Sequence, residues 1–400
     1  MHFRHVVFGS VLFPILAGAA PIQAPSAAVL QNLATQCAAH PVGDFCPGLS
    51  STNPSRRSHE KRAQELQSDA AWGLARISQR NKLSTMGTDK AGPDQLPRRG
   101  ASQDWSFTFD DTWGTGVLVY VVDSGVWSGH SELTGRVENG WVAPGLGGTA
   151  TQDVCDHGTA VASLIAGTTL GVAKKATIVP VRIVDSSRCA PNPPESSTQD
   201  AVPGINWAVS DFKGRTNAKG GVINVSWQVY QTAASEQALT AAIAAGMHVL
   251  VSAGNNNKNQ CLGGPSPAAL QRVKDVGQIV VGGTDWDDAR MDFGSFGSNF
   301  GPCVTLFAPG MSMVVAKGET DGTNHPLGFG GFYNSGTSFA TPLVSGVIAA
   351  LISSGGNMSP ADMRAAVVSK AVQNAGIGKL QGSPDVLLQS AMLGTTAQRR

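Results

Sequence analysis

The sequence predicts an α/β fold with a doubly wound, mostly parallel sheet and helices on both faces. Two observations support this prediction. Continuous Val- and Ile-rich runs recur along the chain, and stretches with helical spacing of apolar residues alternate with them. Runs without polar alternation are typical of strands buried on both faces, as in parallel sheets. The alternation of the two kinds of segment then gives the fold class.

Five apolar runs are the expected strands, and four longer stretches are the expected helices. The strands are GVLVYVVD at 116–123, ATIVPVRIVD at 176–185, GVINVSW at 221–227, MHVLVSAG at 247–254 and QIVVGGTD at 278–285. The helices are HGTAVASLIAG at 157–167, TQDAVPGINWAVSDF at 198–212, EQALTAAIAAG at 236–246 and TSFATPLVSGVIAALISSG at 337–355. In such sheets, sites form at the C-terminal ends of the strands.

The N-terminus is typical of a secretory signal. A short basic segment precedes the apolar stretch VVFGSVLFPILAGAA, and small residues follow it. We expect residues 1–20 to be removed as a signal peptide. That stretch is too short and too often broken by Gly and Pro for a membrane span. The later apolar stretch 339–352 is interrupted by Pro342 and Gly346. We therefore expect a secreted, extracellular protein with no membrane partner.

The composition favours a globular protein and argues against nucleic acid as a partner. Hydrophobic residues make up 42% of the chain and charged residues 14%, so the chain can bury a large core. The formal net charge is only +1. An electrostatic nucleic-acid interface needs a clustered basic face. We expect a monomer.

Residues 21–62 are expected to form a short prosegment. They are rich in Pro, Ser and Ala and end at the dibasic pair Lys61-Arg62. The position of this pair, just before a new pattern starts, favours processing over a merely solvated charge cluster. One domain is expected over 63–400, with its core at about 105–392.

The six cysteines favour disulfides over a metal site. They are Cys37, Cys46, Cys155, Cys189, Cys261 and Cys303. An even count in an exported chain is typical of a disulfide framework. The chain has no Cys-x-x-Cys and no His-Glu-x-x-His, so a zinc site is a weak hypothesis. Cys155 lies two residues before His157, which leaves three roles open: metal ligand, nucleophile beside its base, or structural cysteine.

Four polar residues lie where strands end or helices begin. Asp123 ends one strand, Asn255 follows another, and His157 and Ser338 open helices. Each alone could be a helix cap or a turn residue. Together they supply what acyl transfer needs: a nucleophile, a base, an acid that orients the base, and a donor for the oxyanion. Their chain order, Asp then His then Ser, is that of subtilisin.

At these motifs the chain resembles the subtilisin-like serine proteases, or subtilases, and within them the proteinase K group. The matching segments are VVDSGV, DHGTAVA, SAGNNN and NSGTSFATP, together with AAWGLARIS, which resembles the start of the mature enzyme in that group. Four motifs in this order are specific for the family, whereas any one of them alone would not be. The resemblance implies a serine endopeptidase (a hydrolase) that works through an acyl-enzyme on polypeptide substrates.

The resemblance also implies a role for each residue. Ser338 would attack the scissile carbonyl, and His157 would take its proton and pass it to the leaving amine. Asp123 would hold the imidazole tautomer. Asn255 and the backbone N–H of Ser338 would bind the oxyanion.

The disulfide pairing is implied by resemblance to secreted bacterial members of the family similar to aqualysin, which carry two disulfides at corresponding positions. Cys155 would pair with Cys189, and Cys261 would pair with Cys303. Cys37 and Cys46 would pair within the prosegment or stay free.

The cleft departs from the family pattern. The edge that normally reads Ser-Leu-Gly reads Ser226-Trp227-Gln228 here, and the other edge falls near the Pro-rich stretch APNPPESST. The bulk of these residues predicts a narrowed cleft, and the alternative is that the edges repack and leave a general protease. Further substrate-binding residues are expected in the segment Ser252, Ala253 and Gly254.

No cofactor is expected for the chemistry and no metal ligand is assigned. A structural calcium is doubtful, because Thr305 takes the place of an Asp that helps bind calcium in the proteinase K group, and calcium prefers carboxylate oxygens. Asn357 in Asn-Met-Ser is a candidate for N-glycosylation. Asn224 also matches the motif but lies in an expected core strand.

Three functions remain open at this point. The first is a secreted serine endopeptidase. The second is a dedicated peptide-processing or transpeptidating enzyme with the same chemistry, which the altered cleft edges favour. The third is a non-catalytic secreted binding protein on the same scaffold, against which the four intact motif residues argue.

Overall fold

The computed structural model describes residues 64–83, 105–189, 198–227, 229, 231–259, 261, 277–318 and 335–390. The predicted signal peptide and prosegment, Cys37, Cys46 and Gln228 lie outside these residues, so the expectations for them stay predictions.

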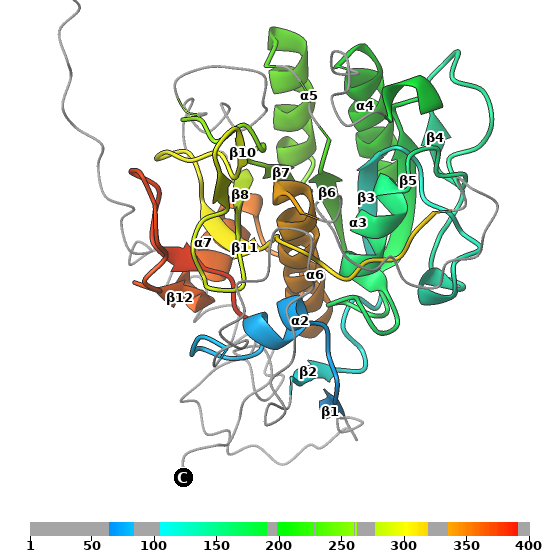
Figure 1. Ribbon diagram of the computed structural model, residues 1–400. Coiled ribbons are helices and arrows are strands. Elements are labelled where there is room, and N and C mark those ends of the chain that lie inside the picture. Colours follow the sequence, from blue (N-terminus) through cyan, green and yellow to red (C-terminus); the bar gives the residue numbers. More distant parts are fainter. Residues whose placement is uncertain are drawn as a thin grey trace, which may run out of the picture.

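A nine-stranded sheet forms the centre of the molecule (Figure 1), with the strand order β12-β13-β11-β8-β7-β6-β3-β5-β4. Every neighbouring pair is parallel except β12 and β13. The strands are β3 (Val117–Asp123), β4 (Trp141–Val142), β5 (Thr177–Arg182), β6 (Gly220–Val225), β7 (His248–Ser252), β8 (Ile279–Thr284), β11 (Leu306–Pro309), β12 (Val372–Gln373) and β13 (Val386–Leu387). The predicted fold class is confirmed.

Helices cover both faces of this sheet (Figure 1). One face carries α2 (Trp72–Ile77), α3 (His157–Ala166), α6 (Thr337–Gly355) and α7 (Pro360–Lys370), and the other carries α4 (Thr198–Gly214) and α5 (Ala233–Ala244). The alternation of side chains along β3 shows the two faces. Val119 and Val121 pack in the core with α3 and α6, whereas Tyr120 and Val122 pack in the core with α4 and α5. Both faces are apolar because both are buried.

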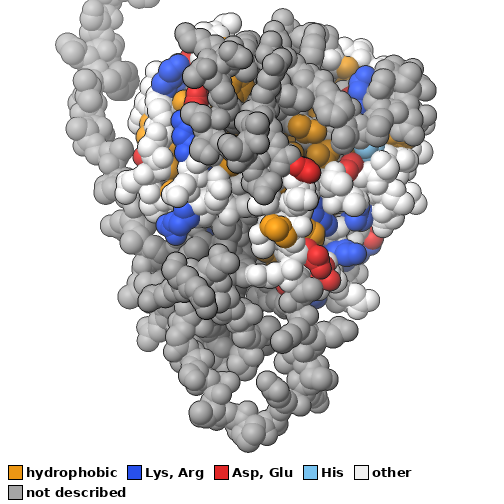
Figure 2. All heavy atoms as spheres, turned by 60° about the horizontal axis from the view of Figure 1, so that its bottom comes forward, with side chains coloured by type: hydrophobic (Ala, Val, Ile, Leu, Met, Phe, Trp, Pro, Cys, Tyr) orange, Lys and Arg blue, Asp and Glu red, His pale blue; other side chains and the backbone are white. Residues whose placement is uncertain are grey.

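Two small antiparallel pairs lie outside the central sheet. They are β1 (Gln64–Gln67) with β2 (Phe107–Asp110), and β9 (Asp292–Phe293) with β10 (Phe296–Gly297). Two 3-10 turns complete the described elements, Ser131–Leu133 and Ser186–Arg188. On the side of the molecule shown in Figure 2, basic and acidic side chains are interspersed.

Helix α2 belongs to the core although it lies far from the catalytic motifs in sequence. Trp72 is 1% exposed, and its indole N–H donates to the carbonyl of Ser312. The guanidinium of Arg76 forms two hydrogen bonds with the carboxylate of Asp288, at 2.8 and 2.9 Å, and both side chains are buried. This paired charge ties the early segment of the chain to the loop after β8.

Helix α6 is continuous over 19 residues, Thr337–Gly355, which confirms the helix predicted there, and it contains Pro342 in its interior. It is long and apolar enough to cross a membrane by length and composition, but 89% of that window is buried inside the protein. We therefore interpret α6 as the core helix of the fold. Pro342 is tolerated because the carbonyl that it leaves without a helical donor, that of Ser338, accepts a hydrogen bond from Ser226 instead.

Candidate active site

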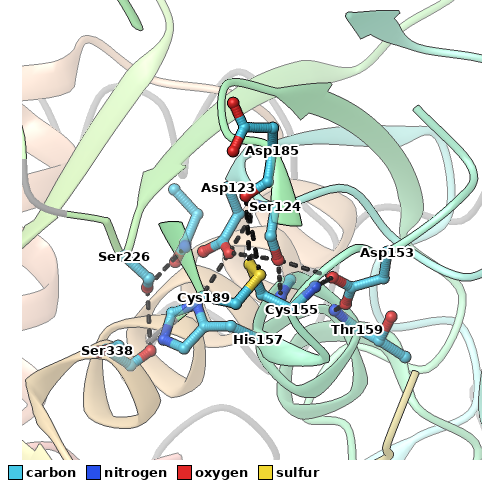
Figure 3. A network of polar contacts seen from close by, with 12 residues as sticks. Asp123, Ser124, Asp153, Cys155, His157, Thr159, Asp185, Cys189, Ser226 and Ser338 are labelled. Carbon is cyan, nitrogen blue, oxygen red and sulfur yellow. Dashed lines mark hydrogen bonds and ion pairs between the residues drawn. A yellow bond between two sulfur atoms is a disulfide. The ribbon is translucent and has the colours of Figure 1, made fainter. Parts of the chain in front are cut away.

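Asp123 and His157 meet at the C-terminal edge of the sheet (Figure 3). Asp123 is the last residue of β3, and His157 is the first residue of α3. The Nδ1 atom of His157 lies 2.8 Å from Oδ1 of Asp123. The backbone N–H of Ser124 donates to the same oxygen at 2.8 Å, and Asp123 is fully buried. The carboxylate is therefore fixed from two directions and holds the imidazole through Nδ1.

The neighbouring acid, Asp153, has a different role. Its carboxylate accepts from the hydroxyl of Ser124 at 2.7 Å and from the backbone N–H groups of Cys155 and Thr159 at 3.0 and 2.7 Å. The Ser124 hydroxyl in turn accepts from the backbone N–H of Gly158 at 3.0 Å. Thus Asp153 satisfies N–H groups at the start of α3, which otherwise lack partners within the helix. The sequence analysis missed this function, because Asp153 lies three residues before the N-cap residue Asp156, outside the position that a capping pattern identifies.

The charges around His157 set its protonation. Burial lowers the pKa of His157. The charge and hydrogen bond of Asp123, together with the charge of Asp153, raise that pKa by more than burial lowers it, so the net shift is upward. The cause is ordinary Coulomb attraction between the imidazolium and two buried carboxylates. The two carboxylates therefore stabilise the imidazolium that forms when His157 takes up a proton.

Ser338 and Asn255 border one small space. Ser338 is the second residue of α6 and is 8% exposed. A Cβ atom placed on Gly336 would lie 3.4 Å from the Ser338 hydroxyl and 3.1 Å from the Asn255 amide nitrogen. Both groups therefore flank the position just beyond Gly336. The absence of a side chain there leaves room for another group to approach them.

The amide of Asn255 is oriented by its neighbours. Its Oδ1 accepts from the backbone N–H of Thr337 at 2.8 Å and from the Thr337 hydroxyl at 2.9 Å. With the oxygen occupied, Nδ2 is the group that remains on the side of Ser338. The Thr337 hydroxyl also accepts from the backbone N–H of Gly254 at 3.1 Å, which fixes the loop after β7. The amide is thus a preorganised donor.

Ser226 supports the backbone of the nucleophile candidate. Its hydroxyl donates to the carbonyl oxygen of Ser338 at 2.9 Å (Figure 3) and accepts from the Asn224 amide at 2.9 Å. Pro342 has no N–H to offer that carbonyl, so the contact replaces a missing helical hydrogen bond. The expected cleft-edge residue Ser226 is therefore buried and also structural.

Two aromatic rings flank the imidazole of His157. The Trp227 ring lies 5.2 Å from it in an edge-to-face arrangement, and the Phe339 ring lies 5.5 Å away, tilted by 51°. Aromatic pairs at such distances stabilise by about 0.5–1.5 kcal/mol beyond burial. These contacts restrict the orientations of the ring.

The other expected cleft residues lie at the end of β7. Ser252 and Gly254 are half-buried, whereas Ala253 is fully buried and its carbonyl accepts from the Asn299 amide at 3.0 Å. Gln228 lies outside the described residues.

The structure contains both disulfides that the resemblance implied. Cys155 is bonded to Cys189, and Cys261 is bonded to Cys303. Cys155 is thereby occupied beside His157 (Figure 3), which leaves no thiol there to act as nucleophile or ligand. Over the described ranges, no group of three or more His, Cys, Asp or Glu side chains could hold a metal ion.

Thr305 itself is a poor ligand for calcium. Thr305 is fully buried, and its hydroxyl accepts from the backbone N–H of Val280 at 3.0 Å. The position thus offers no carboxylate, and its one side-chain oxygen is engaged with the sheet.

Comparisons with known proteins agree with this geometry. The model of the Subtilase family matches residues 114–383. The chain belongs to the subtilase family.

Named relatives align with most of the length of this subtilase. It is 35% identical to "Extracellular serine proteinase" from Thermus sp. (strain Rt41A) over 82% of the chain and 68% of that protein. It is 33% identical to "Subtilisin-like protease 2" from Pseudogymnoascus destructans over 78% of the chain and 65% of that protein. A solved cold-adapted subtilisin-like serine proteinase superposes with a TM-score of 0.62 at 31% identity, over 80% of this chain and 98% of that one. This subtilase is a serine-type endopeptidase, and polypeptides are its substrates.

Proposed function

We propose that Ser338, His157, Asp123 and Asn255 carry out peptide hydrolysis in this subtilase. One observation carries the assignment: the imidazole that Asp123 holds through Nδ1 belongs to the same sheet edge where Ser338 and the Asn255 amide border one space. With Nδ1 engaged, Nε2 is the ring atom that remains to exchange a proton.

The steps follow from these positions. The Ser338 oxygen attacks the scissile carbonyl carbon while its proton passes to Nε2 of His157. The Asn255 Nδ2 donates to the oxyanion that forms. The C–N bond then breaks, and the imidazolium returns the proton to the leaving amine. Water repeats the same sequence on the acyl-enzyme, which releases the acid and restores Ser338.

Hydrolysis of a chromogenic peptide tests the assignment. We expect Ser338→Ala and His157→Ala each to lower kcat by about 10⁶-fold, since these groups act as a unit. The matched control is Asp156→Asn. Asp156 adjoins His157 but has the left-handed backbone that Asn also tolerates, so kcat/KM should stay unchanged. A loss with Asp156→Asn as large as that with His157→Ala would contradict the choice of Asp123 as partner.

The cleft residues support a narrowed specificity, which is a second part of the proposal. Trp227 lies against the imidazole and is half-buried. Its indole would therefore border the substrate residue next to the scissile bond and limit the size of that residue. A peptide-library cleavage profile of the wild type and of Trp227→Leu decides between the alternatives. Few accepted sequences, relaxed by Trp227→Leu, support a restricted or dedicated processing enzyme. Broad cutting at many apolar P1 residues refutes the narrowed cleft.

The compartment and partners complete the proposal. We propose that the chain is secreted and acts as a monomer without a cofactor. The name of the Thermus relative, an extracellular serine proteinase, supports secretion. The two disulfides support it as well, because disulfides persist in oxidising compartments.

A further inference from the structure

We propose that Asn357 is an N-glycosylation site that carries an oligosaccharide when a eukaryotic secretory pathway exports the chain. Asn357 follows the end of α6 and is exposed, and Met358 and Ser359 complete the Asn-x-Ser motif before α7 begins. This inference rests on the proposed secretion. The test below distinguishes a failure of the glycosylation proposal from a failure of the secretion proposal.

A buried histidine fixes the amide of Asn357. The Nε2 atom of His248 lies 2.6 Å from Oδ1 of Asn357, and His248 is 1% exposed. Burial lowers the pKa of His248 to about 4, so its ring is neutral at the pH of secretory compartments and carries one N–H. Because Oδ1 can only accept, the single proton of the neutral ring lies on Nε2, and the buried Nδ1 has no partner among the described residues. His248 therefore donates to Oδ1 and leaves Nδ2 of Asn357 as the free end of the amide.

That arrangement is compatible with the chemistry of attachment. A lipid-linked oligosaccharide diphosphate supplies the sugar. A bond forms between Nδ2 and C1 of the first sugar, the C1–O bond to the diphosphate breaks, and Nδ2 loses one proton. The product is still an amide with Oδ1 and one N–H. The hydrogen bond from His248 is therefore retained after attachment, and the glycan extends from an amide that is already ordered.

The second motif of this kind in the chain has the opposite environment. Asn224, in Asn224-Val225-Ser226, is fully buried within β6. Its Nδ2 donates to the Ser226 hydroxyl at 2.9 Å, and its Oδ1 accepts from Ser345 at 2.8 Å. A glycan on this amide would break the support of the Ser338 backbone described above. The folded chain therefore accommodates modification at Asn357 and excludes it at Asn224.

The Asn357 site lies at the opposite edge of the sheet from the catalytic residues. His248 begins β7, and Asn255 follows its other end. Ser338 and the last residue of α6, Gly355, are separated by most of the length of that helix, about 26 Å at 1.5 Å per residue. A glycan at Asn357 is consequently expected to leave kcat/KM for a small peptide unchanged.

Secretion of the full chain from yeast provides the test. The secreted protein is treated with peptide-N-glycosidase F in ¹⁸O water, which converts a glycan-bearing Asn into ¹⁸O-labelled Asp, and is then mapped by mass spectrometry. We expect a mobility shift on treatment, the label at Asn357 and none at Asn224.

Two variants of Ser359 keep the fold and separate the motif from stability. The Ser359 hydroxyl accepts from the Asp362 N–H at 3.2 Å and caps α7. Thr and Asn both cap helices, but only Thr preserves the motif. Ser359→Thr should keep the glycan, and Ser359→Asn should lose it at equal secretion. Secreted wild type without a glycan, or label at Asn224, overturns this inference alone. A chain that stays unglycosylated inside the cell overturns both this inference and the proposed secretion.

Discussion

The disulfide between Cys155 and Cys189 gives a prediction that separates stability from catalysis. Cys155 lies two residues from His157, yet its sulfur is bonded to Cys189. Removing the bond by the double substitution Cys155→Ser and Cys189→Ser frees the unfolded chain without touching a reacting atom. We therefore expect a loss of stability and no loss of turnover.

The magnitude follows from the loop that the bond closes. The two cysteines are 34 residues apart, and loop-closure entropy then gives a stabilisation of about 3.8 kcal/mol at 25 °C. The second disulfide, Cys261–Cys303, spans 42 residues and gives about 3.9 kcal/mol by the same relation. It is the matched control, because it closes a loop of similar length without adjoining the imidazole.

Two assays on the two double variants test this expectation. Denaturant unfolding in a Ser338→Ala background, where autolysis is absent, should show nearly equal losses of free energy. Active enzyme, counted by active-site titration, should keep the parent kcat/KM in both variants. The reasoning is refuted if only the Cys155/Cys189 variant loses turnover on the scale of His157→Ala, since Cys155 would then act in the chemistry.

Three further predictions follow from the site and the core. Asn255→Ala should lower kcat by about 10²–10³-fold with little change in KM, because it removes one oxyanion donor; a changed KM with unchanged kcat in steady-state kinetics would contradict this. Burial lowers the pKa of His157, but Asp123 and Asp153 together raise it by more, so activity, which needs the neutral ring, should be lost as pH falls through a midpoint above the ordinary value of about 6.5; a kcat/KM profile with its midpoint below that value argues against the pairing. Asp288→Asn should cost about 3–5 kcal/mol in denaturant unfolding, because it leaves the buried guanidinium of Arg76 unpaired, and replacing both residues by apolar ones should recover much of that loss.

The sequence predicted most of the long elements because their patterns are strong, although the 11-residue helix α7 was not among them. The Val-rich run that ends at Asp123 became β3, and the stretch that opens at His157 became α3. The pairing of β1 with β2 was not predicted, because it joins segments some forty residues apart and β1 has no apolar alternation. β12 and β13 have two residues each, which is too short for any period to be recognised.

The candidate site was predicted in its residues but not in its supports. Chain order and the family resemblance selected Asp123 as the partner of His157, whereas the role of Asp153 depends on the three-dimensional position of Ser124. The contact of Ser226 with the Ser338 carbonyl joins residues 112 positions apart. No local pattern reveals such a contact, although Pro342 in the helix signals that one carbonyl needs a donor from elsewhere.

The central claim is that Ser338 is the nucleophile and that His157 activates it. Labelling with a fluorophosphonate probe, followed by mass spectrometry of the labelled peptide, tests this most directly. We predict a single adduct on Ser338 in the wild type, none in Ser338→Ala, and strongly slowed labelling in His157→Ala. Equal labelling of Ser338→Ala, or no labelling of the folded wild type, would contradict the account.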